Sequence, residues 1–210
     1  MSFMKKFRQQ FEKPEGLLGS IAGMLMASVG AEKNKWTVSL LDIEKDDHVL
    51  EIGFGPGLGL HAVSKIVQEG KIVGIDYSEK MLKQAFKRNK VAIQNGQMEL
   101  IQADVQNLPS FDFTFDKVFT INSIIFWDKP IVALSAIREM MSENGIIAVT
   151  VQPFTKGATE ETVKELGNKI SAQLKEAGFT NIKIELKQMK PVSAVCVLGK
   201  NMRYEQENII

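Results

Sequence analysis

The chain has 210 residues, of which 44% are hydrophobic, and a formal net charge of +1. This length allows a sizeable hydrophobic core, and the balanced charge gives no electrostatic basis for binding nucleic acid. The single cysteine excludes an internal disulfide framework and is typical of a reducing compartment. We therefore expect a cytoplasmic globular protein without a nucleic-acid partner.

The N-terminal part, residues 1–45, shows an amphipathic helical pattern. Basic residues precede an uncharged run over residues 16–31, an arrangement that superficially resembles a signal peptide. However, Glu12, Pro14 and Glu15 separate the basic residues from the uncharged run. The run is also short and glycine-rich, whereas a membrane-spanning helix needs about 20 mainly apolar residues. The sequence predicts a helical cap without stable membrane insertion, although contact with a membrane surface remains open.

The next segment carries the most informative pattern of the chain. A short apolar run containing Glu51 leads directly into Gly53, Gly55 and Gly57, and a second apolar run ends at Asp76 after a helical pattern. Strand, glycine loop, helix, strand and acid form the layout of a nucleotide-binding βαβ unit. The glycines let the backbone approach a ligand closely, and the acid accepts from both ribose hydroxyls.

Two features of this loop distinguish between cofactors. The dinucleotide pattern needs a glycine or alanine at position 58, where Leu58 stands, and a later formal match from Gly57 directly follows Pro56, which lacks a backbone donor. The Glu51 carboxylate would repel the pyrophosphate of NAD but suits the ammonium and sulfonium groups of S-adenosylmethionine (SAM). The alternative is that Glu51 caps a helix or pairs with a lysine and has no ligand role.

Strand-like and helix-like patterns alternate along the rest of the chain, which predicts a parallel sheet covered by helices, closed by an antiparallel pair. The expected elements are strands near residues 48–53, 71–76, 97–102, 116–121 and 145–151, helices near 58–68, 79–91, 130–141 and 158–177, and β-rich runs over 181–187 and 192–198.

Four polar residues stand at or just after expected strand ends: Glu51, Asp76, Asp104 and Asn122. Ligands of open α/β sheets bind beyond the carboxyl ends of the strands, where the strand order reverses. The sequence therefore predicts that these four side chains share one site.

The chain resembles the class I, seven-β-strand, SAM-dependent methyltransferases, particularly the small-molecule branch, over about residues 46–200. The segments that carry the resemblance are Glu51–Gly57, Gly74–Ser78, Ala103–Pro109, Phe115–Val118 and Leu174–Phe179. The resemblance implies a doubly wound α/β, Rossmann-like sheet of seven strands, mostly parallel with an antiparallel C-terminal strand. It also implies a methyltransferase domain over residues 46–210 and a lid over residues 1–45.

The resemblance further implies a role for each site residue. Glu51 would lie near the ammonium group of SAM, and Asp76 would hold the ribose. Asp104 would accept from the adenine amine, and Asn122 would lie where methyl donor and acceptor meet. The residues implied to bind SAM are Glu51, Gly53, Phe54, Gly55, Pro56, Gly57, Asp76, Tyr77, Met81, Asp104, Val105 and Asn122.

Transfer of a methyl group from a sulfonium mainly requires alignment of the reactants and exclusion of water, and a base only if the acceptor must lose a proton. His48 and His61 are the only histidines. His48 opens a strand and is interpreted as structural, whereas His61 follows the glycine loop and is the candidate base, beside Asn122 as the other candidate catalytic residue. The sequence shows no acidic cluster typical of a metal site.

Large apolar side chains over residues 121–127 and at Phe3, Phe7, Phe11 and Trp36 predict a pocket for an apolar or aromatic small molecule, although core packing also explains many of them. An NAD-dependent oxidoreductase and a non-catalytic SAM-binding module remain as alternatives. The acceptor atom and the oligomeric state stay open.

Overall fold

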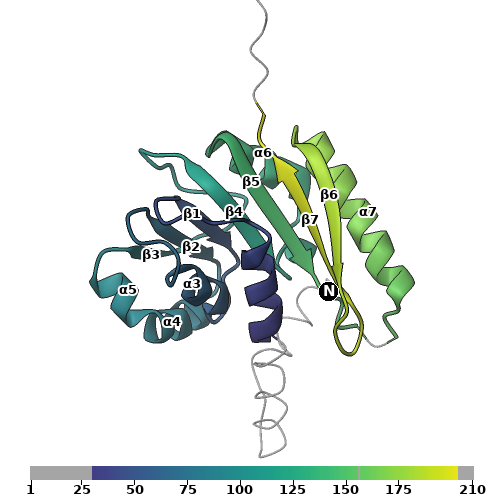
Figure 1. The fold of residues 1–210 in the computed structure, drawn as a ribbon, viewed down its shortest axis with the longest axis horizontal. Coiled ribbons are helices and arrows are strands. Elements are labelled where there is room, and N and C mark those ends of the chain that lie inside the picture. Colours follow the sequence, from purple (N-terminus) through teal and green to yellow (C-terminus); the bar gives the residue numbers. More distant parts are fainter. Residues whose placement is uncertain (1–29, 156, 203–210) are drawn as a thin grey trace, which may run out of the picture.

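A seven-stranded sheet forms the centre of the protein (Figure 1), in a computed structural model that describes residues 30–155 and 157–202. The strand order is β3-β2-β1-β4-β5-β7-β6. β7 runs antiparallel to both of its neighbours, and the other strand pairs are parallel, which confirms the predicted architecture. The strands are β1 (Val49–Ile52), β2 (Ile72–Asp76), β3 (Met98–Gln102), β4 (Phe115–Ile121), β5 (Met141–Val151), β6 (Thr180–Lys187) and β7 (Ala194–Lys200).

Helices cover both faces of the sheet, as expected for a doubly wound fold. One hydrophobic cluster joins the sheet to α6 and α7, and a second joins it to residues 38–41, α3, α4 and α5. Neighbouring residues of β1 divide between the clusters, with Leu50 in the first and Val49 in the second. The helices are α3 (Leu58–Val63), α4 (Glu79–Arg88), α5 (Lys90–Gln94), α6 (Pro130–Glu139) and α7 (Glu160–Glu176), with a short 3₁₀ helix η1 (Ile124–Phe126).

Three element boundaries differ from the prediction. α3 ends at Val63 and does not continue to residue 68, and the helix expected over residues 79–91 is divided into α4 and α5 at Asn89. The buried Asn89 amide donates to the carbonyls of Ala85 (3.0 Å) and Gly57 (3.1 Å), which stabilises the end of α4 against the glycine loop. β5 begins earlier than expected because Met141 pairs with Phe115 before the register shifts.

Only part of the predicted N-terminal cap falls within the described residues. Residues 30–39 form a helix, and Val38 and Leu41 are buried in the second hydrophobic cluster. The hydroxyl groups of Thr37 and Thr150 lie 2.8 Å apart, so this helix packs directly on β5. The other lid residues, Phe3, Phe7 and Phe11 among them, lie outside the described residues. In the described part of the chain, no helix is both long and apolar enough to cross a membrane.

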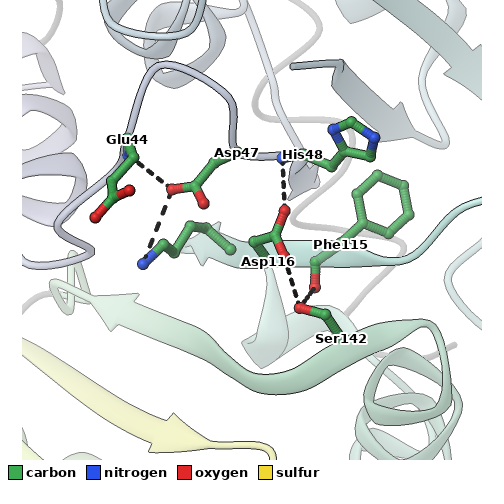
Figure 2. Close-up of polar contacts among 7 residues, drawn as sticks. Glu44, Asp47, His48, Phe115, Asp116 and Ser142 are labelled. Carbon is green, nitrogen blue, oxygen red and sulfur yellow. Dashed lines mark hydrogen bonds and ion pairs between the residues drawn. The ribbon is translucent and has the colours of Figure 1, made fainter. Parts of the chain in front are cut away.

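Polar contacts fasten the amino ends of β1, β4 and β5 together (Figure 2). The Asp116 carboxylate accepts from the His48 backbone amide (2.9 Å) and from the Ser142 hydroxyl (2.7 Å). Asp47 accepts from the Glu44 amide at 2.7 Å. His48 itself packs edge-on against a phenylalanine ring and lies at this end of the sheet, in agreement with the structural role predicted for it.

We expect Asp116→Ala to lower the free energy of unfolding by about 3 kcal/mol or more, because it removes two hydrogen bonds to a charged group, each of which contributes about 1.5–3 kcal/mol. Urea denaturation measures this change. Asp112→Ala is the control, since Asp112 is exposed, and such a substitution changes stability by about 0.5 kcal/mol at most. Equal unfolding midpoints for the two variants would show that the Asp116 contacts contribute nothing.

Candidate functional site

The strand order reverses between β1 and β4, because β2 and β3 lie on one side of β1 and β4 and β5 on the other. Open α/β sheets bind ligands outside the carboxyl ends of the strands at such a point. Gly53 directly follows β1, and Asn122 directly follows β4. The predicted site therefore coincides with the switch point of the sheet.

The glycine loop has a backbone that other residues rarely adopt. Gly53, Gly55 and Gly57 have φ values of +72°, +50° and +77°, in the left-handed region that glycine enters without strain. A Cβ atom at Gly53 would overlap Ser123, and one at Gly57 would approach the Ala85 Cβ to 2.8 Å. A Cβ at Gly55 would meet no atom within 4 Å. Gly53 and Gly57 therefore pack closely against Ser123 and Ala85, whereas the space beside Gly55 is open.

Glu51 lies at the end of β1 with only 2% of its surface exposed. Its carboxylate accepts from the Leu60 backbone amide in the first turn of α3, so the cap that the sequence left as the alternative to a ligand role is present. Among the described residues, no hydrogen-bond donor reaches the second oxygen, Oε2. Burial raises the pKa of Glu51 well above its usual value, and the negative charge of Asp76 raises it further. A buried carboxylate with one free oxygen favours a cationic ligand.

Gly59 explains how this carboxylate fits under the loop. A Cβ atom at position 59 would come within 2.6 Å of Glu51 Oε1. Glycine at this position therefore leaves the space that the Glu51 side chain occupies.

Asp76 connects the end of β2 to the glycine loop. Its two oxygens accept from the backbone amides of Gly55 and Ser78, each at 2.8 Å. Burial raises the pKa of Asp76, and the two amide hydrogen bonds oppose this shift. Each carboxylate oxygen accepts more than one hydrogen bond, so Asp76 can shape the loop and still bind a ribose hydroxyl.

The residues assigned to the adenine ring lie beside Asp76. Tyr77 follows it directly and is 57% exposed, and Met81 lies in the first turn of α4. The Ala103 amide donates to the Asp76 carbonyl at 3.2 Å, which brings the Asp104–Val105 segment next to the end of β2. The structure therefore gathers these four residues along the ends of β2 and β3.

Asn122 is held by β5. It adopts a left-handed backbone (φ +56°), and its side-chain oxygen accepts from the Gln152 amide at 2.8 Å. Sequence reasoning missed Gln152, although it directly follows β5 just as Asn122 follows β4. Its side chain accepts from the Lys33 ammonium at 3.3 Å, and Lys33 was missed as well. A contact between residues 119 positions apart leaves no pattern in the sequence.

His61 lies against α4. Burial lowers its pKa, the charges of Lys65 and Arg88 lower it further, and the Asn89 side chain opposes the shift. Lys65 lies in the turn after α3, Arg88 is the last residue of α4 and Asn89 stands at the α4–α5 junction, so none of these neighbours lies at the ends of β4 and β5. The structure therefore does not bring His61 together with Asn122. Among the described residues, no group of three or more acidic, histidine or cysteine side chains could hold a metal ion.

The predicted apolar pocket is only partly available to a ligand. Ile124 and Trp127 are buried in the core, and the Trp127 indole donates to the Ser123 hydroxyl at 3.0 Å. Trp36 packs against the second hydrophobic cluster. Ile125 and Phe126 are 38% and 37% exposed. The exposed apolar surface next to Asn122 is therefore smaller than the sequence predicts.

Comparison with known proteins finds methyltransferases among both the similar sequences and the similar structures. A sequence profile of a methyltransferase domain matches residues 49–145. The uncharacterized methyltransferase YdaC of Bacillus subtilis is 34% identical over 180 residues, which cover 86% of this chain and 97% of YdaC. A demethylmenaquinone methyltransferase of Bacillus cereus is 34% identical over 85 residues, covering 40% of this chain and 35% of that protein. A SAM-dependent methyltransferase from Aquifex aeolicus has the same fold, with a TM-score of 0.65 and 20% identity over 80% of this chain and 89% of its own.

Proposed function

Because the chain belongs to the class I SAM-dependent methyltransferases, we propose that it transfers the methyl group of SAM to a small-molecule acceptor by in-line displacement. The observation that supports a SAM site on this chain most directly is Glu51 Oε2, a buried carboxylate oxygen that no donor of the described residues reaches, beside an open glycine loop. SAM carries an ammonium group that would pair with this oxygen, and the dinucleotide NAD would place a pyrophosphate near it.

The residues present fit SAM along its whole length. Glu51 would bind the ammonium group, and the loop from Gly53 to Gly57 would hold the methionine part. Asp76 would bind the ribose, while Tyr77 and Met81 would flank the adenine. SAM supplies a methyl group already activated on a sulfonium, so the protein's contribution is to orient the acceptor and exclude water.

We place the acceptor beside Asn122, on the side of β4 and β5. The exposed parts of Ile125, Phe126 and Phe154 supply apolar surface for an apolar or aromatic molecule. The acceptor named by the Bacillus cereus relative is demethylmenaquinone, which is compatible with such a surface. A lid formed by the N-terminal residues, a cytoplasmic location and the absence of a nucleic-acid partner belong to the same proposal and rest on the amino-acid sequence.

Calorimetric titration with S-adenosylhomocysteine (SAH), and with NAD in parallel, tests the cofactor site. We expect SAH to bind with a micromolar dissociation constant and NAD not to bind. Binding of NAD alone would contradict the assignment of this loop to SAM. Transfer of a labelled methyl group to a panel of small aromatic and apolar molecules then separates an enzyme from a non-catalytic SAM-binding protein.

A further inference from the structure

Lys33 is a buried lysine at the carboxyl edge of the sheet. Only 7% of its surface is exposed, although lysine is rarely buried unless it is paired. Its side chain leaves the helix over residues 30–39 and donates to Gln152 Oε1 at 3.3 Å. Burial lowers the pKa of Lys33 to about 8. The protein therefore holds a desolvated amine directly beside a strand end.

The ammonium group has no counter-charge among the residues that the structure describes. Lys33 makes no ion pair with any of them, and its only hydrogen-bond acceptor there is the neutral Gln152 amide. The adjacent acid, Glu32, pairs instead with Lys187 of β6 at 3.3 Å. An ammonium group donates three hydrogen bonds, so the amine keeps donors available for an anionic partner.

Hydrogen bonds to neighbouring carbonyl groups orient the Gln152 side chain toward Lys33. The Gln152 side-chain amide donates to the carbonyls of Lys190 (3.2 Å) and Val192 (2.9 Å), so its oxygen is turned toward Lys33. The Gln152 backbone amide donates to Asn122 Oδ1 at 2.8 Å. A continuous chain of hydrogen bonds therefore leads from Lys33 through Gln152 to Asn122, where we place the acceptor.

Strand order separates Lys33 from the residues assigned to SAM. Glu51, Asp76 and Asp104 lie at the ends of β1, β2 and β3, whereas Gln152 follows β5, which is separated from β1 by β4. Neighbouring strands are about 4.8 Å apart. Lys33 is thus anchored on the acceptor side of the switch point.

We propose that Lys33 binds an anionic oxygen group of the methyl acceptor, so that the acceptor is an apolar or aromatic molecule that carries a carboxylate or a similar anion. This rests on the proposed methyltransferase function. The anion would supply the counter-charge that the described residues do not provide for Lys33 and, together with Gln152, would fix the acceptor relative to Asn122. The exposed apolar groups beside Asn122 would contact the uncharged part of the same molecule.

Matched probes test this assignment on the full chain saturated with SAH. Benzoate carries the anion, and benzamide is its neutral counterpart of similar size. Chemical-shift titrations give the dissociation constant of each probe for the wild type, for Lys33→Met and for Lys35→Met. Lys35 lies on the same helix with an exposed side chain and is the control. Methionine keeps the length of the side chain, and thermal unfolding checks that both variants fold.

We expect the wild type and Lys35→Met to bind benzoate at least tenfold more tightly than benzamide, and Lys33→Met to lose this preference. Equal binding of the two probes by the wild type, or absence of binding by both, would overturn the proposal, as would an unchanged preference in Lys33→Met.

SAH affinity identifies the source of the anion. We expect Lys33→Met to bind SAH as the wild type does. A tenfold loss would mean that Lys33 binds the carboxylate of the cofactor, and the assignment to the acceptor would be wrong. If the wild type itself does not bind SAH, the proposed function fails and not this assignment alone.

Discussion

Asp76→Ala is expected to weaken the binding of SAH by about 100-fold or more. On the proposed assignment, the substitution would remove two charge-assisted hydrogen bonds to the ribose. Each such bond contributes about 1.5–3 kcal/mol, and every 1.4 kcal/mol corresponds to about tenfold in affinity. It also removes the acceptor for the Gly55 amide, which now lies 2.8 Å from Asp76 Oδ2. The glycine loop would then lose the contact that holds its middle residue, which adds to the loss.

Calorimetric titration of the folded variant with SAH measures this effect. Asp76→Asn retains an oxygen for one of the two backbone amides, so its loss of affinity should be smaller than that of Asp76→Ala. Urea denaturation of both variants shows whether the loop change also lowers stability. Wild-type affinity in a folded Asp76→Ala protein would remove Asp76 from the cofactor site.

The fold could be predicted from the sequence because its signals are local. Short apolar runs alternate with helical patterns, and each run became a strand of the sheet. The antiparallel position of β7 was expected from the closing pair of β-rich runs around Pro191. The predicted ends of elements were wrong where a tertiary contact determines them. Asn89 divides a continuous helical pattern because its side chain donates to Gly57, 32 positions away.

Within the candidate site, local sequence signals predicted only the residues that lie at or just after the end of a strand. Glu51, Asp76 and Asn122 were expected at the carboxyl edge, and the structure places them there. Gln152 follows the same rule and was overlooked. Lys33 could not be found from the sequence, because a lysine in an amphipathic helix normally faces solvent. Here that helix packs on β5, and Lys33 is buried.

Glu51 should release a proton when SAH binds. Burial raises its pKa well above the usual value, so the folded protein without ligand retains a proton that an exposed glutamate loses. The ammonium group of SAH favours the ionised carboxylate. Affinity for SAH should therefore rise with pH, by up to about tenfold per unit, from the usual glutamate pKa until Glu51 is ionised in the free protein.

The raised pKa of Glu51 has the opposite effect on the stability of the free protein, which should decrease as pH rises. Because the folded state holds a proton that the unfolded chain releases near the usual pKa, the free energy of unfolding should fall as pH rises through this window. Saturating SAH should reduce this fall, since it binds the ionised form. Thermal unfolding with and without SAH at a series of pH values measures both trends.

Glu51→Gln separates the charge from the shape of the side chain. The amide can still accept from Leu60, but it carries no charge for the ammonium group, so we expect at least a tenfold loss of SAH affinity and no pH dependence from this position. Glu99→Gln, at an exposed position of β3, should behave as the wild type. Titration in two buffers with different ionisation enthalpies counts the protons released. If the wild type releases none and Glu51→Gln binds SAH equally well, Glu51 serves only to cap α3, and the cationic end of SAM must be bound by other residues.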